Sequence, residues 1–149
     1  MAGYTNSDTI IQKESFHTIH HEFAHIFDQT KRRPFEFDEQ GKGYYSADWI
    51  NSDNEEAYSE GFISPYASSQ AGEDFAEMVA FMLVEGKAGF DEIVDGITGT
   101  STRGTTAAQA KNRLRNKEET IVKYFHDIWG IDFYALQAQT RTAIENEFY

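Results

Sequence analysis

The sequence has no cysteine and only two prolines among its 149 residues, and it has no long apolar run. The absence of cysteine excludes disulfide bonds and thiolate metal ligands but leaves the compartment open. No apolar run approaches the length of a membrane span, and residues 1–7 lack the charged and apolar parts of a signal peptide. The start is equally consistent with a piece of a longer chain, whose upstream region would then carry any export signal.

Basic residues are also scarce, with 13 Lys and Arg against 25 Asp and Glu, for a formal net charge of −12. This balance argues against nucleic acid and anionic membranes as partners and favours basic or neutral ones. Apolar residues make up 40% of the chain, including 12 Phe and 8 Tyr. We therefore expect one folded domain over residues 1–149 with a substantial core.

Helical periodicity dominates the chain, which predicts a mainly α fold with little or no sheet. Helices are expected at about residues 8–29, 72–85 and 106–129, with a last helix that Asp132 caps. Ser68 or Ser69 would cap the second helix, and Gly130 would end the third. The glycines from Gly86 to Gly104 indicate a loop-rich connection that holds one short helix at 91–95. Phe35 and Phe37 alternate with polar residues and allow a short strand.

The first helix contains His21-Glu22-Phe23-Ala24-His25, which fits H-E-x-x-H, a zinc-hydrolase signature when it lies on a helix. On a helical wheel His21 and His25 lie about 40° apart, where an i, i+4 pair can converge on one ion. Glu22 points to one side of that pair and can reach a water on the metal without binding the metal. The predicted core stripe lies on the opposite face and consists of Phe16, Ile19, Phe23, Ile26 and Phe27.

Two readings of these histidines remain open from the first helix alone. They either line a metal site or lie on the surface opposite the core stripe, because H-E-x-x-H also occurs by accident. His17, four residues before His21, is a spare ligand, a hydrogen-bond partner of the site or an exposed residue. His20 lies nearer the apolar side and is interpreted as packed or partly exposed.

The second helix carries Glu73 and Glu77 at i, i+4 spacing among almost entirely apolar residues. Carboxylates on so apolar a helix are costly to bury unless they are paired, hydrogen-bonded or bound to metal. The alternative is that both lie in the exposed first turn, where acids interact favourably with the helix dipole. This alternative is weaker for Glu77, which lies a full turn deeper.

HEFAH followed by SPYASSQAGEDFAEM resembles the Glu-type zincins, specifically the branch that includes anthrax lethal factor. It is more similar still to zinc metallohydrolase lipoproteins encoded beside nutrient-import systems in Bacteroidetes. The resemblance rests on Tyr66 and on Glu73-x-x-Ala76-Glu77 downstream of H-E-x-x-H, and it covers about residues 20–82. It implies an extracytoplasmic or membrane-anchored lipoprotein, whereas the sequence itself leaves the location open.

The resemblance implies that His21, His25 and Glu73 bind one Zn²⁺, that Glu22 is the general base and that Tyr66 faces the reacting carbonyl. Three protein ligands leave a fourth position for water, as in catalytic zinc sites. We therefore predict a zinc metallopeptidase that acts on a peptide or protein substrate.

Two acidic residues are expected to support the ligands by hydrogen bonds rather than to bind zinc. Glu77 would accept a hydrogen bond from a ligand histidine, because its position among apolar residues requires a partner. Asp28 projects from the same side as His25 and either accepts a proton from a histidine ring or is a surface charge.

Two other functions remain open at this stage. The chain could be a non-catalytic module of a nutrient-import assembly that keeps zinc as a structural feature, although such a module requires neither Glu22 nor Tyr66. The same zinc chemistry would also permit hydrolysis of a non-peptide amide or ester. Five charged residues of the third helix are interpreted as a solvated face, namely Arg113, Arg115, Lys117, Glu118 and Glu119.

Overall fold

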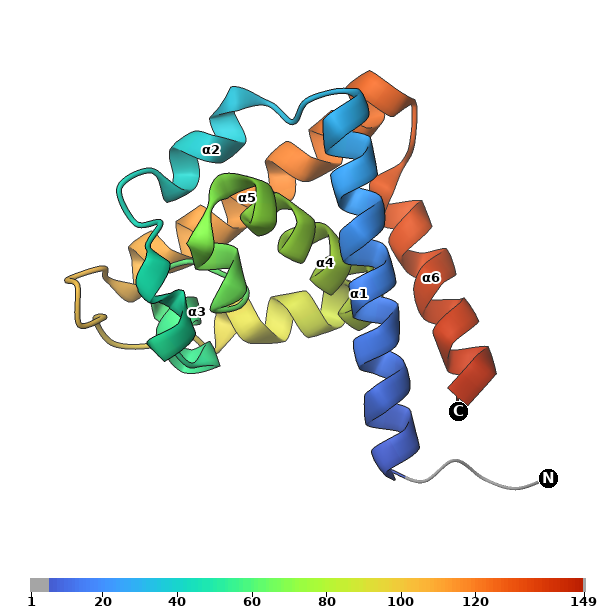
Figure 1. The fold of residues 1–149 in the computed structure, drawn as a ribbon, viewed down its shortest axis with the longest axis horizontal. Coiled ribbons are helices and arrows are strands. Elements are labelled where there is room, and N and C mark those ends of the chain that lie inside the picture. The colour runs from blue at the N-terminus through green and yellow to red at the C-terminus, as the bar shows by residue number, and fades with distance from the viewer. Residues whose placement is uncertain (1–5, 149) are drawn as a thin grey trace.

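The fold consists of α-helices and short 3₁₀ helices over residues 6–148, the part of the chain that this computed structural model describes (Figure 1). In chain order they are α1 (Asn6–Thr30), α2 (Phe35–Gly41), η1 (Ala47–Asn51), α3 (Asn54–Ser59), η2 (Tyr66–Ser69), α4 (Ala71–Asp95), α5 (Ala107–Trp129) and α6 (Phe133–Phe148). The only β pairing among the described residues is one isolated bridge between Thr100 and Thr106. The prediction of a mainly α fold with little or no sheet is confirmed. Residues 1–5, most of the segment compared with a signal peptide, lie outside the described residues.

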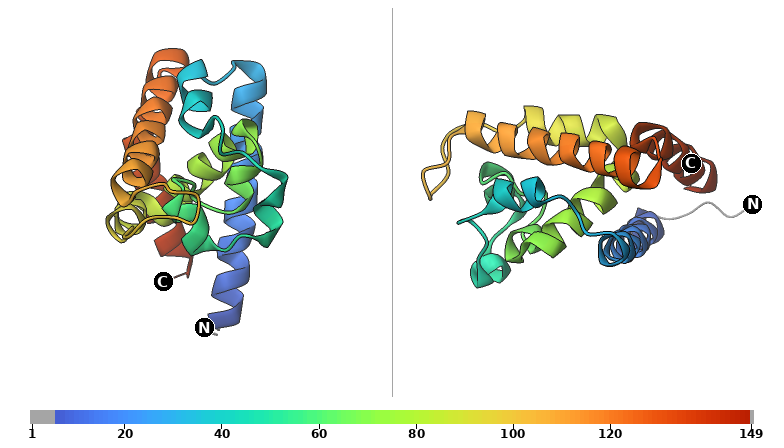
Figure 2. Two further views of the ribbon diagram at one scale, coloured as in Figure 1. Left: turned by 90° about the vertical axis from the view of Figure 1, so that its left-hand side faces the viewer. Right: turned by 90° about the horizontal axis from the view of Figure 1, so that it is seen from above.

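Helix α4 forms the centre of the molecule. Residues 74–80 of α4 are all buried, because neighbouring helices cover this segment, which is apolar except for Asp74 and Glu77, on several sides. The helices α1, α5 and α6 all pack against α4, and in the view from above α4 lies between α5 and α1 (Figure 2). Neither α4 nor any other described helix has an apolar stretch long enough to cross a membrane.

A bend at Gly86 replaces the predicted end of the second helix. Gly86 adopts φ 76° and ψ 178°, and helical structure then resumes and continues to Asp95. Only glycine tolerates this conformation easily, since it has no Cβ. The expected loop after residue 85 is therefore wrong, because the glycine bends the helix instead of ending it. The change of direction is visible within α4 in Figure 1.

The buried face of α1 is the opposite of the predicted one. Ile19, Phe23 and Ile26 are 49%, 55% and 57% exposed, and Phe16 is only half-buried. Phe27 alone of the five predicted stripe residues packs against the hydrophobic core. The physical reason is that α4 presents carboxylates to α1, so the histidine side of α1 turns inward to pair with them.

Local sequence signals at the other helices give mixed results. Thr106 caps α5 with a capping box, Gly130 ends α5 in the left-handed conformation at φ 65°, and Asp132 accepts from the backbone N–H of Ala135 at 3.1 Å. The predictions for Gly130 and Asp132 are confirmed, whereas the Thr106 cap was not predicted. The short strand at Phe35 and Phe37 is wrong because this segment forms α2, with Pro34 at its N-cap. Ser68 and Ser69 do not cap α4, because both belong to η2.

The predicted solvated face of α5 is partly wrong, because Lys117 and Glu118 are buried. The Lys117 ammonium lies 2.8 Å from Asp74 Oδ2, with both side chains fully buried. It also donates to the Gly61 carbonyl at 2.7 Å, and Tyr45 donates its hydroxyl to Asp74 at 2.8 Å. These bonds fix the start of α4 against α5 and against the loop that leads to η2.

Candidate metal centre

The centre of the site lies where the polar face of α1 meets the first two turns of α4. His21 and His25 are one turn apart on α1, and Glu73 and Glu77 are one turn apart on α4. Side chains at i, i+4 share a helix face, so each helix contributes a pair that points at the other. His21 and Glu77 are buried and the other two are half-buried, so the alternative of exposed surface residues does not hold for these four.

The ligand atoms of His21, His25 and Glu73 form a compact triangle. Glu73 Oε2 lies 2.8 Å from His21 Nε2 and 3.0 Å from His25 Nε2. The two Nε2 atoms lie 3.0 Å from each other. The structure therefore brings together the three residues that the sequence analysis selected as ligands.

This triangle fits the requirements of a zinc ion. Zinc is bound by histidine nitrogen and carboxylate oxygen at about 2.0–2.2 Å in a tetrahedron, which places ligand atoms roughly 3.3–3.5 Å apart. The three atoms are within 3.0 Å of one another, so they need to separate by only about 0.5 Å to hold the ion. Two imidazoles and one carboxylate are also the donor set of many catalytic zinc sites.

A hydrogen bond to Glu77 orients the ring of His21. The Nδ1 atom of His21 lies 2.9 Å from Glu77 Oε2, on the side of the ring away from Glu73. When Nδ1 carries the hydrogen and donates it to the carboxylate, Nε2 keeps its lone pair and can bind a metal. The Glu77 hydrogen bond also raises the pKa of His21, mainly because the carboxylate stabilises the charged ring, while burial acts in the opposite direction.

Glu77 joins three segments of the chain. Its Oε2 also lies 2.5 Å from His17 Nε2, and its Oε1 accepts a hydrogen bond from the Ser64 hydroxyl at 2.8 Å. Burial alone would raise the pKa of Glu77, but the hydrogen bonds from His17, His21 and Ser64 lower it to about 2. The carboxylate therefore stays ionised and ties α1, α4 and the segment before η2 together.

A second group of possible ligands shares His21 with the first. It consists of His17, His21 and Glu77, whose ligand atoms lie within 4.8 Å of one another. In this group the two Glu77 oxygens already accept hydrogen bonds from two histidines and a serine. A metal at the group around Glu73 would leave the Glu77 bonds intact, whereas a metal at this second group would replace some of them.

Tyr66 lies at the edge of the triangle. Its ring stacks on His21 at 5.9 Å between centroids and meets the ring of Trp49 edge-on at 5.0 Å. Ser64 helps to set its position, since the Ser64 hydroxyl oxygen accepts from the Ala67 backbone N–H at 3.1 Å. Burial raises the pKa of the Tyr66 hydroxyl. The negative charges of nearby carboxylates raise it further, with Glu73 contributing more than Glu22. The hydroxyl therefore remains protonated at neutral pH and is able to donate.

Glu22 and Asp28 differ in where the structure places them. Glu22 is exposed on α1, in the helical turn between the two histidines, and its charge contributes to the raised pKa of Tyr66. Asp28 lies a turn beyond His25 and pairs with Arg33, which donates from Nη1 at 2.5 Å and from its backbone N–H at 2.8 Å. The structure therefore does not bring Asp28 to a histidine. Arg33 provides the counter-charge that the sequence analysis did not consider.

Three residues near the site were missed or left open by the sequence analysis. His17 carries a usable signal, because it lies one turn before His21 on the same helix face. No sequence pattern marks Ser64 or Trp49, since their positions near the site depend on how residues 43–66 fold against α4. His20 is half-buried and bonds the Phe16 carbonyl through Nδ1 at 2.7 Å, so it is not directed at the metal centre.

Comparison with known proteins shows which family the chain belongs to. A solved structure titled as a "putative zinc-binding metallo-peptidase" from Bacteroides caccae matches it at 28% identity, with a TM-score of 0.78. The match covers 96% of this chain and 53% of the other, so this chain spans about half the length of that protein. The curated proteins contain no match. The family described as "Putative zinc-binding metallo-peptidase" matches residues 4–134. Because this match spans most of the 149 residues, the chain belongs to that family.

Proposed function

We infer that this protein is a zinc-dependent hydrolase that cleaves peptide bonds, with His21, His25 and Glu73 as the zinc ligands. The observation that carries the proposal is the triangle of two Nε2 atoms and one carboxylate oxygen, all within 3.0 Å of one another. Family membership supports the choice of zinc and of peptide hydrolysis. Three protein ligands leave a position open, which suits a catalytic site better than a structural one.

The reaction assigns separate roles to the metal and to two side chains. Zinc in this site would lower the pKa of a water molecule and polarise the scissile carbonyl. Glu22 lies in the turn between the ligand histidines, where its carboxylate takes the proton from the attacking water and passes it to the leaving amine. The protonated Tyr66 hydroxyl donates a hydrogen bond to the carbonyl oxygen as negative charge develops on it.

The hydrogen bonds around Glu77 support this assignment. A carboxylate that accepts from the far nitrogen of a ligand histidine holds the ring in its metal-binding orientation. Here Glu77 accepts from His21 Nδ1 at 2.9 Å and from the hydroxyl of Ser64, two residues before Tyr66. One carboxylate thereby aligns a zinc ligand with the segment that carries the oxyanion donor.

The roles of Glu22 and Tyr66 can be tested with a fluorogenic peptide library. Glu22→Gln should retain zinc and lose hydrolysis, because the amide has nearly the same shape but cannot accept the proton. Tyr66→Phe should retain zinc and lose about 10²-fold or more in kcat, as expected for one oxyanion donor.

Matched controls are available in the same protein. Glu14→Gln changes another exposed carboxylate of α1, and Tyr134→Phe changes another exposed tyrosine, so both should keep full activity. If Glu22→Gln and Tyr66→Phe cleave the library as well as the wild type does, the mechanism is wrong. If the zinc-loaded wild type cleaves no member, the non-catalytic alternative replaces this proposal.

A further inference from the structure

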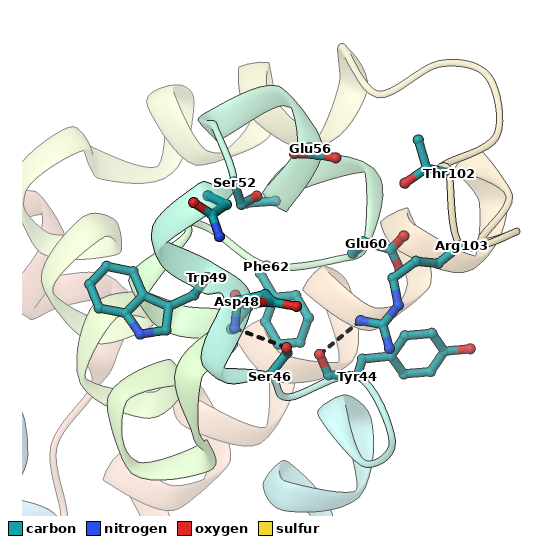
Figure 3. Close-up of a pocket in the computed structure, with 13 residues that line it drawn as sticks. Tyr44, Ser46, Asp48, Trp49, Ser52, Glu56, Glu60, Phe62, Thr102 and Arg103 are labelled. Carbon is teal, nitrogen blue, oxygen red and sulfur yellow. Dashed lines mark hydrogen bonds between the residues drawn. The ribbon is translucent and has the colours of Figure 1, made fainter.

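A pocket of about 480 Å³ opens beside the metal centre, between the segment 44–62 and the loop before α5 (Figure 3). Its walls include the aromatic rings of Tyr44, Trp49 and Phe62. Figure 3 shows Trp49 at one side of the pocket and Glu60 at the other. None of the residues assigned above to zinc binding or catalysis lines this pocket.

The charged side chains that line the pocket are mostly acidic. It contains three carboxylates, Asp48, Glu56 and Glu60, against one cationic side chain, Arg103. The Arg103 guanidinium is already engaged, since it donates to the carbonyls of Tyr44 at 3.1 Å and Gly43 at 3.3 Å. A second cation, Arg113, lies behind Glu60 and donates to its backbone carbonyl at 2.8 Å. In the described part of the chain, no ion pair involves the carboxylates of Asp48, Glu56 or Glu60.

Glu60 gives a second and independent indication of a ligand. It is only 7% exposed, and its Oε2 accepts a hydrogen bond from the Thr105 hydroxyl at 2.8 Å. Its Oε1 is buried and has no hydrogen-bond partner in the described part of the chain. A buried acceptor without a donor is costly, and most such atoms in proteins are paired. A donor that enters the pocket would satisfy this oxygen.

Two ring contacts connect the pocket to the reaction centre. The Trp49 ring, which lines the pocket, meets the Tyr66 ring at 5.0 Å, and the Tyr66 ring stacks on His21 at 5.9 Å. The Ser46 backbone N–H also donates to the Ser68 carbonyl at 2.9 Å, which joins the pocket rim to η2. An extended peptide advances about 3.3–3.6 Å per residue, so a side chain two or three residues from the scissile bond can reach the pocket.

We propose that this pocket binds a lysine or arginine side chain of the peptide substrate. The proposal rests on the proposed function, because it names the class of substrate that the same site cleaves. The aliphatic stem of such a side chain packs on the half-buried Trp49 while its charged head reaches the carboxylates. Cations also interact favourably with aromatic faces. The formal net charge of −12 attracts basic peptides over a longer range.

Binding can be tested without catalysis by NMR titration with N-acetyl-arginine amide. The indole N–H signal of Trp49 should shift, whereas that of Trp129, which does not line the pocket, should stay in place. N-acetyl-citrulline amide has nearly the same shape without the charge, and it should bind at least about tenfold more weakly, as expected for hydrogen bonds to a charged group. Equal affinity for the two amides, or no shift at Trp49, would overturn the proposal.

Substitutions test whether the pocket carboxylates cause the preference for arginine over citrulline. Glu60→Gln keeps the shape and the contact with Thr105 and should remove most of the preference for arginine over citrulline. The double variant Asp48→Asn/Glu56→Gln changes only exposed carboxylates and should reduce the preference by about threefold or more. Glu55→Gln on the same helix as Glu56 does not line this pocket and is the matched control, with an unchanged preference. A preference that survives in Glu60→Gln and in the double variant would contradict the proposal.

Cleavage assays separate this inference from the proposed function. The kcat/KM for peptides with arginine near the scissile bond should exceed that for matched citrulline peptides, and Glu60→Gln should remove the difference. Cleavage with no such difference would leave the proposed function intact and overturn the inference. Arginine-selective binding without cleavage would leave the pocket assignment intact and overturn the proposed function.

Discussion

Glu73 and Glu77 occupy equivalent places on successive turns of α4, yet their surroundings give them different roles. Glu73 Oε2 faces the two Nε2 atoms of the histidines on α1. Both oxygens of Glu77 accept hydrogen bonds from His17, His21 and Ser64. A metal at Glu73 leaves these bonds in place, whereas a metal at Glu77 would have to replace some of them.

Alanine substitutions should therefore affect zinc affinity unequally. Glu73→Ala removes a proposed ligand and should abolish tight binding, whereas Glu77→Ala removes only the hydrogen bond that supports His21 and should weaken binding by roughly 10–100-fold. Competition titration with a chromophoric chelator measures both affinities. Glu119→Ala, an exposed site on α5, should bind zinc as the wild type does. The reverse order of affinities would show that Glu77 is the ligand.

At the scale of single residues, the sequence predicts which side chains lie together on one helix face. It does not predict which side chains tertiary packing adds from other segments. The spacing of His21 and His25, and of Glu73 and Glu77, predicts each pair because i, i+4 geometry is local. The partner of Asp28 was not predictable, because Arg33 reaches it only through the turn after α1. The placement of Ser64 under Glu77 depends in the same way on tertiary packing.

Among the elements, the junction of α4 with α5 depends on a fully buried ion pair. Lys117 and Asp74 are both inaccessible to solvent, and burial raises the pKa of Asp74 and lowers that of Lys117, because it disfavours both charges. The sequence alone indicated a solvated α5 face here, since charged residues are rarely buried. The pair is nevertheless buried, because the Gly61 carbonyl and the Tyr45 hydroxyl supply further hydrogen bonds.

Lys117→Met should lower the free energy of unfolding by about 3–5 kcal/mol, because it leaves Asp74 buried without its counter-charge. The double variant Asp74→Asn/Lys117→Met should lose less than the sum of the two single variants. Urea denaturation followed by circular dichroism measures these differences. Lys123→Met breaks an exposed ion pair and should leave the stability nearly unchanged. Equal effects of Lys117→Met and Lys123→Met would contradict this account of the junction.

The bend in α4 gives a second prediction for an element. Gly86→Ala should lower the free energy of unfolding by about 1–3 kcal/mol, because its φ of 76° and ψ of 178° strain any side chain. The added Cβ would also lie 2.8 Å from Arg141 Cγ. Gly72→Ala in the first turn of α4 meets no atom closer than 3.8 Å and should leave stability unchanged or raise it by up to about 1 kcal/mol. If Gly86→Ala is as stable as the wild type, the bend does not require glycine.

On the scale of the whole molecule, the number and order of the long helices were predictable, as were their bounds except for the C-terminal end of α4, because periodicity and caps are local signals. The side of α1 that faces inward was not. A helical wheel ranks faces by apolarity and therefore selects Ile19, Phe23 and Ile26, which the structure leaves exposed. The inward face is set by pairing between His21, His25 and the carboxylates of α4, which is a property of two helices together.

Metal removal should affect the stability of the whole domain, because the proposed zinc ligands come from two helices that lie far apart in the sequence. At a free zinc concentration of about 100 times Kd, binding contributes about 2.7 kcal/mol. Chelation should therefore lower Tm by about 5–10 °C in a domain of this size. Differential scanning calorimetry with and without a chelator measures the change. In His21→Ala the chelator should have no effect, and a comparable drop in that variant would show that the metal binds elsewhere.

The most direct test of the central claim is elemental analysis of protein purified without chelator and then supplied with zinc. The wild type should contain one zinc per chain, and His21→Ala and His25→Ala should contain almost none. His17→Ala should retain the metal, because His17 hydrogen-bonds Glu77 and is not one of the three proposed ligands. His126→Ala, at an exposed position, should also retain it. No zinc in the wild type, or full zinc in His25→Ala together with its loss in His17→Ala, would contradict the assignment of the metal to His21, His25 and Glu73.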